Sequence, residues 1–232
     1  MVGIFFFLPP CFSCFIPGFR LQPREALLVP IMGNQAFFLT FSCGVNMEII
    51  PTRFPGLWVI QPKVFEDHRG FFVETYNQRD FISHGIYYDF VQDNHARSEQ
   101  VGVLRGLHFQ TPPAAQAKLV RVTRGSVYDV VVDIRKGSPT YGQWYGEELS
   151  GKNFRQMLIP KGFAHGYVTL EPKTEFQYKV DGFYAPEHDG GLRWDDPDIG
   201  IPWPVDEPIL SDKDKRLPLM KDFDSPFVYT PS

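Results

Sequence analysis

Short apolar segments separated by glycine and proline follow one another through most of this chain and limit it to one fold class. Residues 118–123 alternate polar and apolar side chains, and residues 127–134 form a strongly β-branched run. Such segments recur at a spacing of roughly 8–12 residues, which is typical of strands joined by tight turns. The pattern predicts an all-β fold, a jelly roll or a similar barrel, with a few short helices.

The helices expected beside these strands are short. Residues 77–84 form one of them, with Asn77 as the N-cap and Gly85 after the last turn. Another is expected near residues 211–216, after an irregular segment that begins at Tyr184 and is rich in Pro, Asp and Trp. We find no internal repeat and no heptad pattern in the sequence, which leaves a single jelly-roll domain as the prediction.

The first 46 residues differ from the remainder. Residues 1–19 carry no charge, but Pro9, Pro10 and Pro17 interrupt any helix long enough to cross a bilayer. The positively charged start of a secretory signal is also missing, because the first basic residue is Arg20. We therefore predict that residues 1–46 are an N-terminal extension, disordered or upstream of the true start. The domain then spans 47–232, and the protein is expected in the cytoplasm without a membrane span.

Charge and cysteine content exclude several classes of function. The net charge is -4 and no basic run occurs, so a nucleic-acid partner is not expected. All three cysteines, Cys11, Cys14 and Cys43, lie in the extension. The predicted domain therefore needs neither disulfides nor a cysteine metal site.

The segment 103–110 combines apolar residues with Arg105, His108 and Gln110. In a regular strand Arg105 and His108 would point to opposite faces. Gly106 between them predicts a bulge that brings both side chains to the same side. The alternative is a core strand in which His108 is an ordinary, hydrogen-bonded histidine.

Polar residues on several other predicted strands also need an explanation, because barrels that hold a ligand can carry such residues on their inner face. Arg69, Arg105 and Lys118 are cationic, which points to an anionic ligand such as a phosphate or diphosphate. A metal site is the competing interpretation. The sequence contains no HxH pair, no phosphate-binding loop and no dinucleotide fingerprint. We therefore expect no metal and no cofactor.

Eight separated segments resemble the dTDP-4-dehydrorhamnose 3,5-epimerase family in order and spacing. They are KVF (63–65), DHRGFFVE (67–74), FVQDNH (90–95), VLRGLHFQ (103–110), KLVR (118–121), DIR (133–135), PKGFAHG (160–166) and LSDKD (210–214). The resemblance covers residues 47–232 and none of 1–46. It implies a cupin-type jelly roll, a homodimer and a reaction that requires no metal or other cofactor.

The resemblance also implies roles for four residues in the epimerisation of a 4-keto sugar. His108 corresponds to the base and Asp214 to the carboxylate that orients it. Tyr178 corresponds to the acid that returns a proton to the opposite face of the sugar. Lys118 corresponds to the cation that stabilises the enolate oxygen.

The same resemblance implies a set of residues that bind a dTDP-linked 4-keto-6-deoxyhexose. Phe72 and Tyr184 are expected to stack on the thymine ring. At Asp189 the chain departs from the family, which more often has a glutamate near this position. The implied substrate-binding residues are Arg69, Phe72, Glu74, Gln92, Asn94, Arg105, Lys118, His165, Tyr184, Asp189 and Lys213.

Two alternatives remain open from the sequence. One is an epimerase that inverts a single centre, or a ketoisomerase, acting on a related nucleotide-linked 4-keto sugar. The other is a barrel that binds a sugar nucleotide without catalysis, which could keep Arg69 and Arg105 but would not need His108 or Tyr178. The presence of both favours the enzyme that inverts the two carbons flanking the ketone of dTDP-4-dehydro-6-deoxy-D-glucose.

Overall fold

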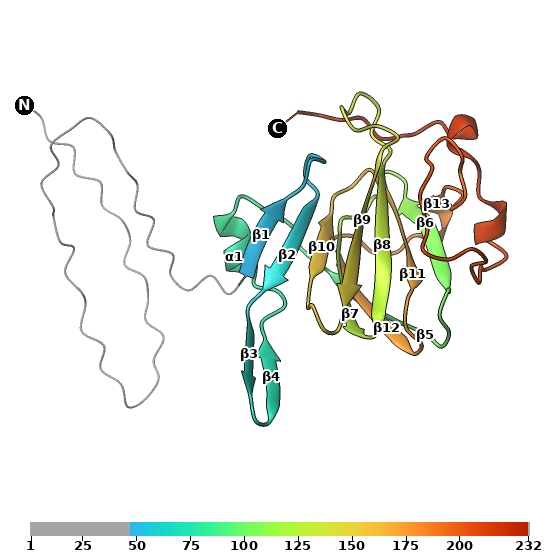
Figure 1. The fold of residues 1–232 in the computed structure, drawn as a ribbon. Helices are drawn as coiled ribbons and strands as arrows, with labels where there is room; N and C mark the ends of the chain where they lie inside the picture. Colours follow the sequence, from blue (N-terminus) through green and yellow to red (C-terminus); the bar gives the residue numbers. More distant parts are fainter. Residues whose placement is uncertain (1–46, 232) are drawn as a thin grey trace, which may run out of the picture. The chain divides into compact units, whose positions relative to one another are not determined.

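Two antiparallel sheets pack face to face in the computed structural model, which describes residues 47–231 (Figure 1). The predicted N-terminal extension, 1–46, lies outside the described residues. One sheet has six strands in the order β1-β2-β10-β7-β12-β5. Its strands are β1 (Met47–Pro51), β2 (Trp58–Pro62), β5 (Gln92–Ser98), β7 (Lys118–Arg124), β10 (Gln156–Ile159) and β12 (Thr174–Val180).

The second sheet has five strands in the order β13-β6-β11-β8-β9. Its strands are β6 (Leu104–Gln110), β8 (Ser126–Asp133), β9 (Trp144–Ser150), β11 (Phe163–Thr169) and β13 (Asp189–Gly191). Strands β3 (Val64–Asp67) and β4 (Gly70–Val73) form a separate hairpin that projects from the body of the domain (Figure 1). This architecture confirms the predicted all-β jelly roll.

Helices are few and short, as predicted. The α-helix α1 (Gln78–Ser83) begins after Asn77, whose side chain accepts a hydrogen bond from the Arg79 amide at 3.1 Å. The remaining helical elements are the 3₁₀ turns η1 (Pro186–His188), η2 (Asp214–Arg216) and η3 (Met220–Asp222). Within residues 47–231 no helix is long and apolar enough to cross a membrane.

The main core fills the space between the two sheets. Val120, Met157 and Phe176 point into it from the six-stranded sheet, and Val131 and Phe163 point into it from the five-stranded sheet. All five are at most 3% exposed. Burial of each such side chain contributes about 1.5–3 kcal/mol relative to leaving it in water, so this core fixes the spacing of the two sheets.

Both outer faces are partly covered as well. Phe81 of α1 packs against Leu119 on the outer side of the six-stranded sheet. The C-terminal segment packs Phe227 against Phe109 and Ile134 on the outer side of the five-stranded sheet. These cover layers explain why both sheets can be rich in apolar residues on each side.

The bulge predicted at Gly106 is confirmed. β6 pairs with β11 with a shift in register: His108 lies opposite His165, whereas Arg105 lies opposite Tyr167. Gly106 has a φ of +138°, and a Cβ atom built on it would lie 2.5 Å from the Gly166 Cα. Only glycine tolerates this close approach. The extra residue in β6 lets Arg105 and His108 line the same cavity.

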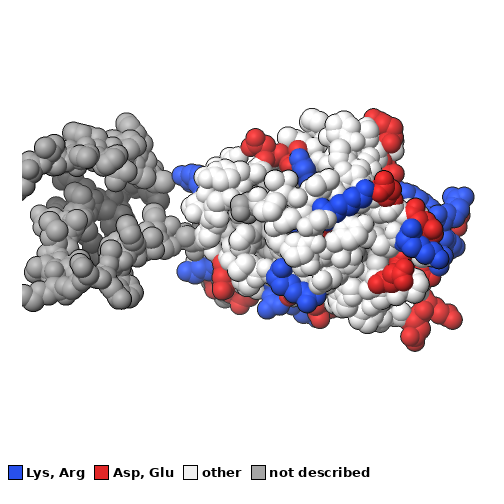
Figure 2. All heavy atoms as spheres, turned by 90° about the horizontal axis from the view of Figure 1, so that it is seen from above, with Lys and Arg blue, Asp and Glu red and all other residues white. Residues whose placement is uncertain are grey.

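Charged residues of both signs are mixed on the surface of the domain. On the face that Figure 2 shows, basic and acidic side chains alternate and no extended basic region occurs among the described residues.

Candidate active site

A cavity of about 450 Å³ opens between the two sheets. Strands β5, β6, β7, β11 and β12 form its walls, together with η2 and the segment that leads into it. Its size suits a small organic ligand. Seven residues that the sequence singled out line it, namely Arg105, His108, Lys118, His165, Tyr178, Lys213 and Asp214.

His108 and Asp214 form a short hydrogen-bonded pair. His108 Nε2 donates to Asp214 Oδ1 at 2.5 Å, although the residues are 106 positions apart in the chain. The Asp214 side chain is 3% exposed and that of His108 is 31% exposed. Burial alone would raise the pKa of Asp214. Hydrogen bonds with His108 and Ser211 and the positive charge of Lys213 outweigh burial, and the pKa of Asp214 is lowered. Asp214 is therefore an ionised partner that fixes the His108 ring.

A second histidine–aspartate pair faces the first. His165 lies directly opposite His108 in the β6–β11 pairing. Its Nε2 is 3.0 Å from each carboxylate oxygen of Asp129, which comes from the neighbouring strand β8. Both side chains are buried. Burial lowers the pKa of His165 despite the opposing effect of Asp129. The His165 imidazole is therefore neutral and donates from Nε2.

Lys118 supplies the cation of the cavity. It begins β7, and its Nζ lies 3.5 Å from the carbonyl oxygen of His108. Burial lowers the pKa of Lys118 to about 8, while the charges of Asp129 and Asp189 act in the opposite direction. The ammonium is therefore the main form at neutral pH, and it is less solvated than a surface lysine.

Tyr178 enters the cavity from β12, on the opposite wall from β6. Burial raises its pKa, and the nearby charge of Arg105 opposes this effect. The phenol therefore stays protonated at neutral pH. Arg105 itself is anchored by Ser98, with its Nε 3.5 Å from the Ser98 hydroxyl.

Four predicted binding residues form a polar network beside the cavity. Asn94 lies opposite Tyr178 in the β5–β12 pairing and accepts a hydrogen bond from Gln92 Nε2 at 3.0 Å. Gln92 also accepts from the amide of Tyr184, whose hydroxyl lies 3.3 Å from Asp189 Oδ2. Asp189 forms an ion pair with Lys213 of the cavity wall. These residues can therefore extend the cavity toward a bulkier part of a ligand.

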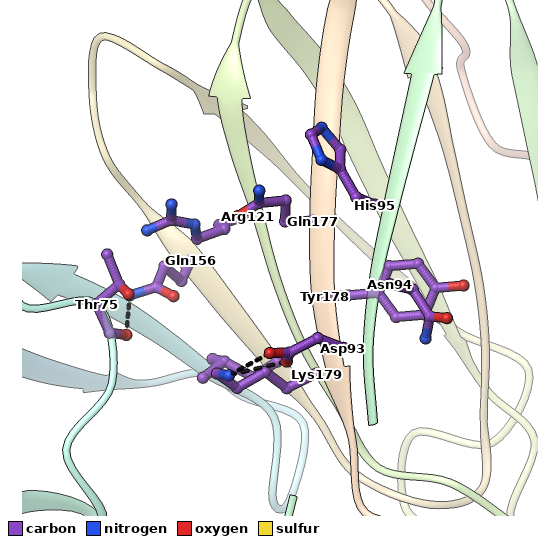
Figure 3. Close-up of a pocket in the computed structure, with 10 residues that line it drawn as sticks. Thr75, Asp93, Asn94, His95, Arg121, Gln156, Gln177, Tyr178 and Lys179 are labelled. Atoms are coloured by element: carbon purple, nitrogen blue, oxygen red, sulfur yellow. Dashed lines mark hydrogen bonds and ion pairs between the residues drawn. The ribbon is translucent and has the colours of Figure 1, made fainter. Parts of the chain in front are cut away.

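A smaller polar cavity of about 220 Å³ occupies the reverse face of the six-stranded sheet. Arg121, Gln177, Tyr178 and Asn94 all border it. Figure 3 shows the side chains of Arg121 and Gln177 on one side of the strands and those of Tyr178 and Asn94 on the other. Alternation along β5 and β12 thus separates the two faces. Among residues 47–231 we find no group of His, Cys, Asp and Glu side chains that could hold a metal ion.

Three predicted binding residues do not reach the cavity of their own chain. Arg69 and Phe72 lie on the β3–β4 hairpin, and Glu74 follows directly after β4. The hairpin extends away from the end of the domain that carries β6 and β13 (Figure 1). The Phe72 side chain is exposed, and the ion pair of Arg69 is with Asp67 of the same hairpin.

Some residues that line or support the cavity were not predicted from the sequence. Asp129 sits in an otherwise apolar run and shares the parity of the inward-facing Val131, which is a signal that a buried partner exists. Tyr167 and Phe176 also line the cavity, and their rings stack with centroids 4.1 Å apart. Their aromatic character suited a core as well as a cavity, so no separate signal was available for them.

Comparisons with known proteins agree on one family. The family model described as dTDP-4-dehydrorhamnose 3,5-epimerase matches residues 51–222. A Pseudomonas aeruginosa protein named dTDP-4-dehydrorhamnose 3,5-epimerase is 54% identical over 182 residues, covering 77% of this chain and 98% of the relative.

Two solved structures extend the likeness to the fold. The dTDP-4-dehydrorhamnose 3,5-epimerase of Bacillus anthracis, with TDP and PPi bound, is 52% identical with a TM-score of 0.74 and covers 75% of this chain and 99% of its own. The dTDP-6-deoxy-D-glucose-3,5-epimerase of Legionella pneumophila, in complex with dTDP-4-keto-L-rhamnose, is 46% identical with a TM-score of 0.76 and covers 79% and 100%. This chain is therefore an isomerase and belongs to the dTDP-4-dehydrorhamnose 3,5-epimerase family.

Proposed function

We propose that the protein inverts the two carbons flanking the ketone of dTDP-4-dehydro-6-deoxy-D-glucose, giving dTDP-4-dehydro-L-rhamnose. The observation that carries the proposal is the convergence of His108–Asp214, Lys118 and Tyr178 on one cavity from four separate elements. A base, an oriented carboxylate, a cation and a protonated phenol are the groups that this chemistry needs. The names of the matched relatives supply the substrate.

The reaction follows from the acidity of carbons next to a carbonyl. His108 takes the proton, and the electron pair of the broken C–H bond moves toward the ketone oxygen to form an enolate. The hydrogen bond to Asp214 occupies Nε2, so Nδ1 is the ring nitrogen that accepts the proton. The Lys118 ammonium stabilises the enolate oxygen. Tyr178 then gives its hydroxyl proton to the carbon from the opposite face, and exchange with water restores both residues.

Direct product analysis tests this function. Purified protein is incubated with dTDP-4-dehydro-6-deoxy-D-glucose, and the ring proton couplings of the product are measured by NMR. The proposal requires inversion at both carbons next to the ketone. Tight binding of the nucleotide sugar without any conversion would instead indicate the non-catalytic barrel, and inversion at one carbon would indicate the single-centre epimerase.

Replacing Tyr178 with phenylalanine is expected to uncouple the two inversions. The ring remains in place, but the proton donor on that face is lost, so inversion that depends on Tyr178 should slow by about 10²–10⁴-fold. His108 still abstracts protons, and hydrogen exchange with solvent therefore continues at one carbon or more. NMR of the product formed in D₂O measures both effects. Equal inversion at both carbons at the wild-type rate would remove Tyr178 from the proposed mechanism.

We further propose that the enzyme is a homodimer whose β3–β4 hairpin completes the site of the second copy. Two aromatic residues of the hairpin are exposed to solvent, Phe65 at 42% and Phe72 at 70% of their full accessible surface. β5 is the end strand of its sheet, so one row of its backbone groups lacks a strand partner within residues 47–231. A hairpin from a second copy placed along β5 would bring Arg69, Phe72 and Glu74 beside Asn94. This arrangement explains how these three residues can bind substrate although they do not line the cavity of their own chain.

Mixing two defective variants tests the shared site. Arg69→Ala is expected to raise KM by about 10–100-fold through loss of a charge-assisted contact, and His108→Ala removes the base. In a mixed dimer one site has both an intact hairpin and an intact cavity. Co-expression should therefore recover about a quarter of the wild-type kcat/KM.

The matched control for this mixing combines His108→Ala with Asp214→Asn, which both lie in the same cavity. No intact site forms in that mixed dimer, and activity should stay at the level of the parents. If the Arg69→Ala mixture also shows only the average of its parents, the hairpin acts within its own chain.

We also propose that the enzyme acts in the cytoplasm, as expected from the sequence.

A further inference from the structure

Gln110 is a buried polar residue at the end of β6 to which the proposed reaction gives no role. It lies two positions after His108, and the pairing of β6 with β13 is regular over both residues. Phe109 between them packs on the outer side of the sheet, so Gln110 points to the same side as His108. Gln110 is only 5% exposed. A buried amide is costly unless hydrogen bonds replace its contacts with water, so Gln110 needs partners.

The partners of the Gln110 amide are the two backbone groups of Ala185. Oε1 of Gln110 accepts a hydrogen bond from the Ala185 amide at 2.8 Å, and Nε2 donates to the Ala185 carbonyl oxygen at 3.1 Å. One planar amide therefore fixes both the position and the orientation of this backbone unit. Within the described chain, Gln110 is not among the residues that line the cavity. Its effect on a ligand must therefore pass through Ala185.

Ala185 ends the irregular segment 181–185, which joins β12 to η1. The residue before it, Tyr184, is 54% exposed. The Tyr184 amide donates to Gln92 Oε1 at 3.3 Å, and its hydroxyl lies 3.3 Å from Asp189 Oδ2. Because an irregular segment lacks the regular hydrogen bonds of a strand, side-chain contacts such as these determine its path. The two hydrogen bonds of Gln110 are made one residue away from the Tyr184 ring.

A second contact from the same end of β6 supports the first. The Thr111 amide donates to the His188 carbonyl oxygen at 2.8 Å, and the Thr111 hydroxyl lies 3.2 Å from His188 Nδ1. Ala185 directly precedes η1, and His188 is its last residue. Gln110 and Thr111 thus hold this turn at both of its ends. The strand that carries His108 therefore also sets the place of Tyr184.

We propose that Gln110 is a positioning residue that holds the Tyr184 ring beside the cavity, where the base of a nucleoside diphosphate binds. This inference rests on the proposed function, in which the substrate is linked to dTDP. Tyr184 touches the base, and Gln110 acts through the backbone next to it. A ring that is fixed before binding loses less conformational freedom when the base stacks on it, so the contact raises affinity. The base is remote from the ketone, so ground state and transition state gain equally.

Gln110→Met tests this role, because methionine has a similar length but can form neither hydrogen bond. We expect the Kd for dTDP, measured by calorimetric titration of the full chain, to rise by about 5–50-fold. The KM for the nucleotide sugar should rise by the same factor, whereas kcat at saturation should stay within about twofold of the wild-type value. Gln143→Met is the matched control. Gln143 donates to the Pro139 carbonyl oxygen at 3.4 Å in an exposed turn before β9, and its replacement should change neither constant.

A double-mutant cycle with Tyr184→Ala separates this role from a general structural one. Without the Tyr184 ring, Gln110 has nothing to position, so adding Gln110→Met should raise the Kd for dTDP by less than about twofold further. Circular dichroism verifies the fold of each variant. If the methionine variant does not fold, Gln110→Asn carries the same cycle, because its amide is too short to reach both backbone groups of Ala185.

The inference is overturned if the increases in Kd from Gln110→Met and Tyr184→Ala multiply, because Gln110 then acts independently of the ring. An unchanged Kd for dTDP in Gln110→Met, or a wild-type protein that does not bind dTDP, also overturns it. Failure of the proposed function gives a different result. In that case the wild-type protein converts no nucleotide sugar, while the titrations with dTDP still report on Gln110 and Tyr184.

Discussion

Replacing His108 with alanine is expected to lower kcat by about 10²–10⁴-fold. His108 is the one residue of the cavity that combines a partly exposed imidazole with a buried, ionised carboxylate partner. Without it no positioned base can remove the proton next to the ketone. The affinity for dTDP should change little, because the proposed nucleotide contacts lie at Gln92, Asn94 and the hairpin. Steady-state kinetics and calorimetric titration with dTDP separate the two effects.

Two further variants, Asp214→Asn and His95→Ala, are compared with His108→Ala. Asp214→Asn keeps the ring near its position but removes the charge that stabilises the imidazolium, so a loss smaller than that of His108→Ala is expected. His95→Ala lies on the reverse face of the sheet, where the side chain is half-exposed, and should leave kcat unchanged. An active His108→Ala variant would assign the base to another group.

Replacing Lys118 with methionine is expected to lower kcat by about 10²–10³-fold. Methionine has a similar length but carries no charge, so the enolate oxygen would face an apolar side chain. The wild-type enzyme should also lose activity as pH rises through about 8, because burial lowers the pKa of Lys118 to about 8 and only the ammonium stabilises the enolate. Lys118→Arg should remove this basic limb even if its kcat is lower, since arginine keeps its charge throughout this range.

Lys179→Met is the matched control for Lys118. Lys179 lies on β12 next to Tyr178, but it points to the reverse face and pairs with Asp93 at 2.8 Å (Figure 3). Its replacement should preserve both kcat and the pH profile. A Lys118→Met variant with wild-type kcat would show that another donor stabilises the enolate.

Much of the fold could be predicted because local patterns determine it. Residues 118–123, predicted as a strand, form β7 (Lys118–Arg124), and the helix begins at the predicted cap, Asn77. Gly106 indicated the bulge because few other reasons place glycine in such a strand. The strand expected at 127–134 is instead β8, Ser126–Asp133. Pairing with β9 and β11 determines those ends, and single-strand periodicity does not contain that information.

The site was harder to predict than the fold from local sequence patterns. Periodicity alone does not bring Asp214 to His108 across 106 residues, and only the family resemblance suggested that pair. The resemblance also grouped Arg69 with Arg105 in one site, although one chain holds them far apart. Asp129 was missed because a single carboxylate in an apolar strand does not reveal its partner. In each case the missing information was the tertiary path of the chain.

Solvent deuterium incorporation tests the central claim most directly. The wild-type protein is incubated with dTDP-4-dehydro-6-deoxy-D-glucose in D₂O, and the two carbons flanking the ketone are followed by NMR and mass spectrometry. The proposed mechanism predicts deuterium at both carbons, with incorporation by His108→Ala reduced to near the level without enzyme. Absence of deuterium at both carbons with the wild-type protein, or equal incorporation with His108→Ala, would contradict it.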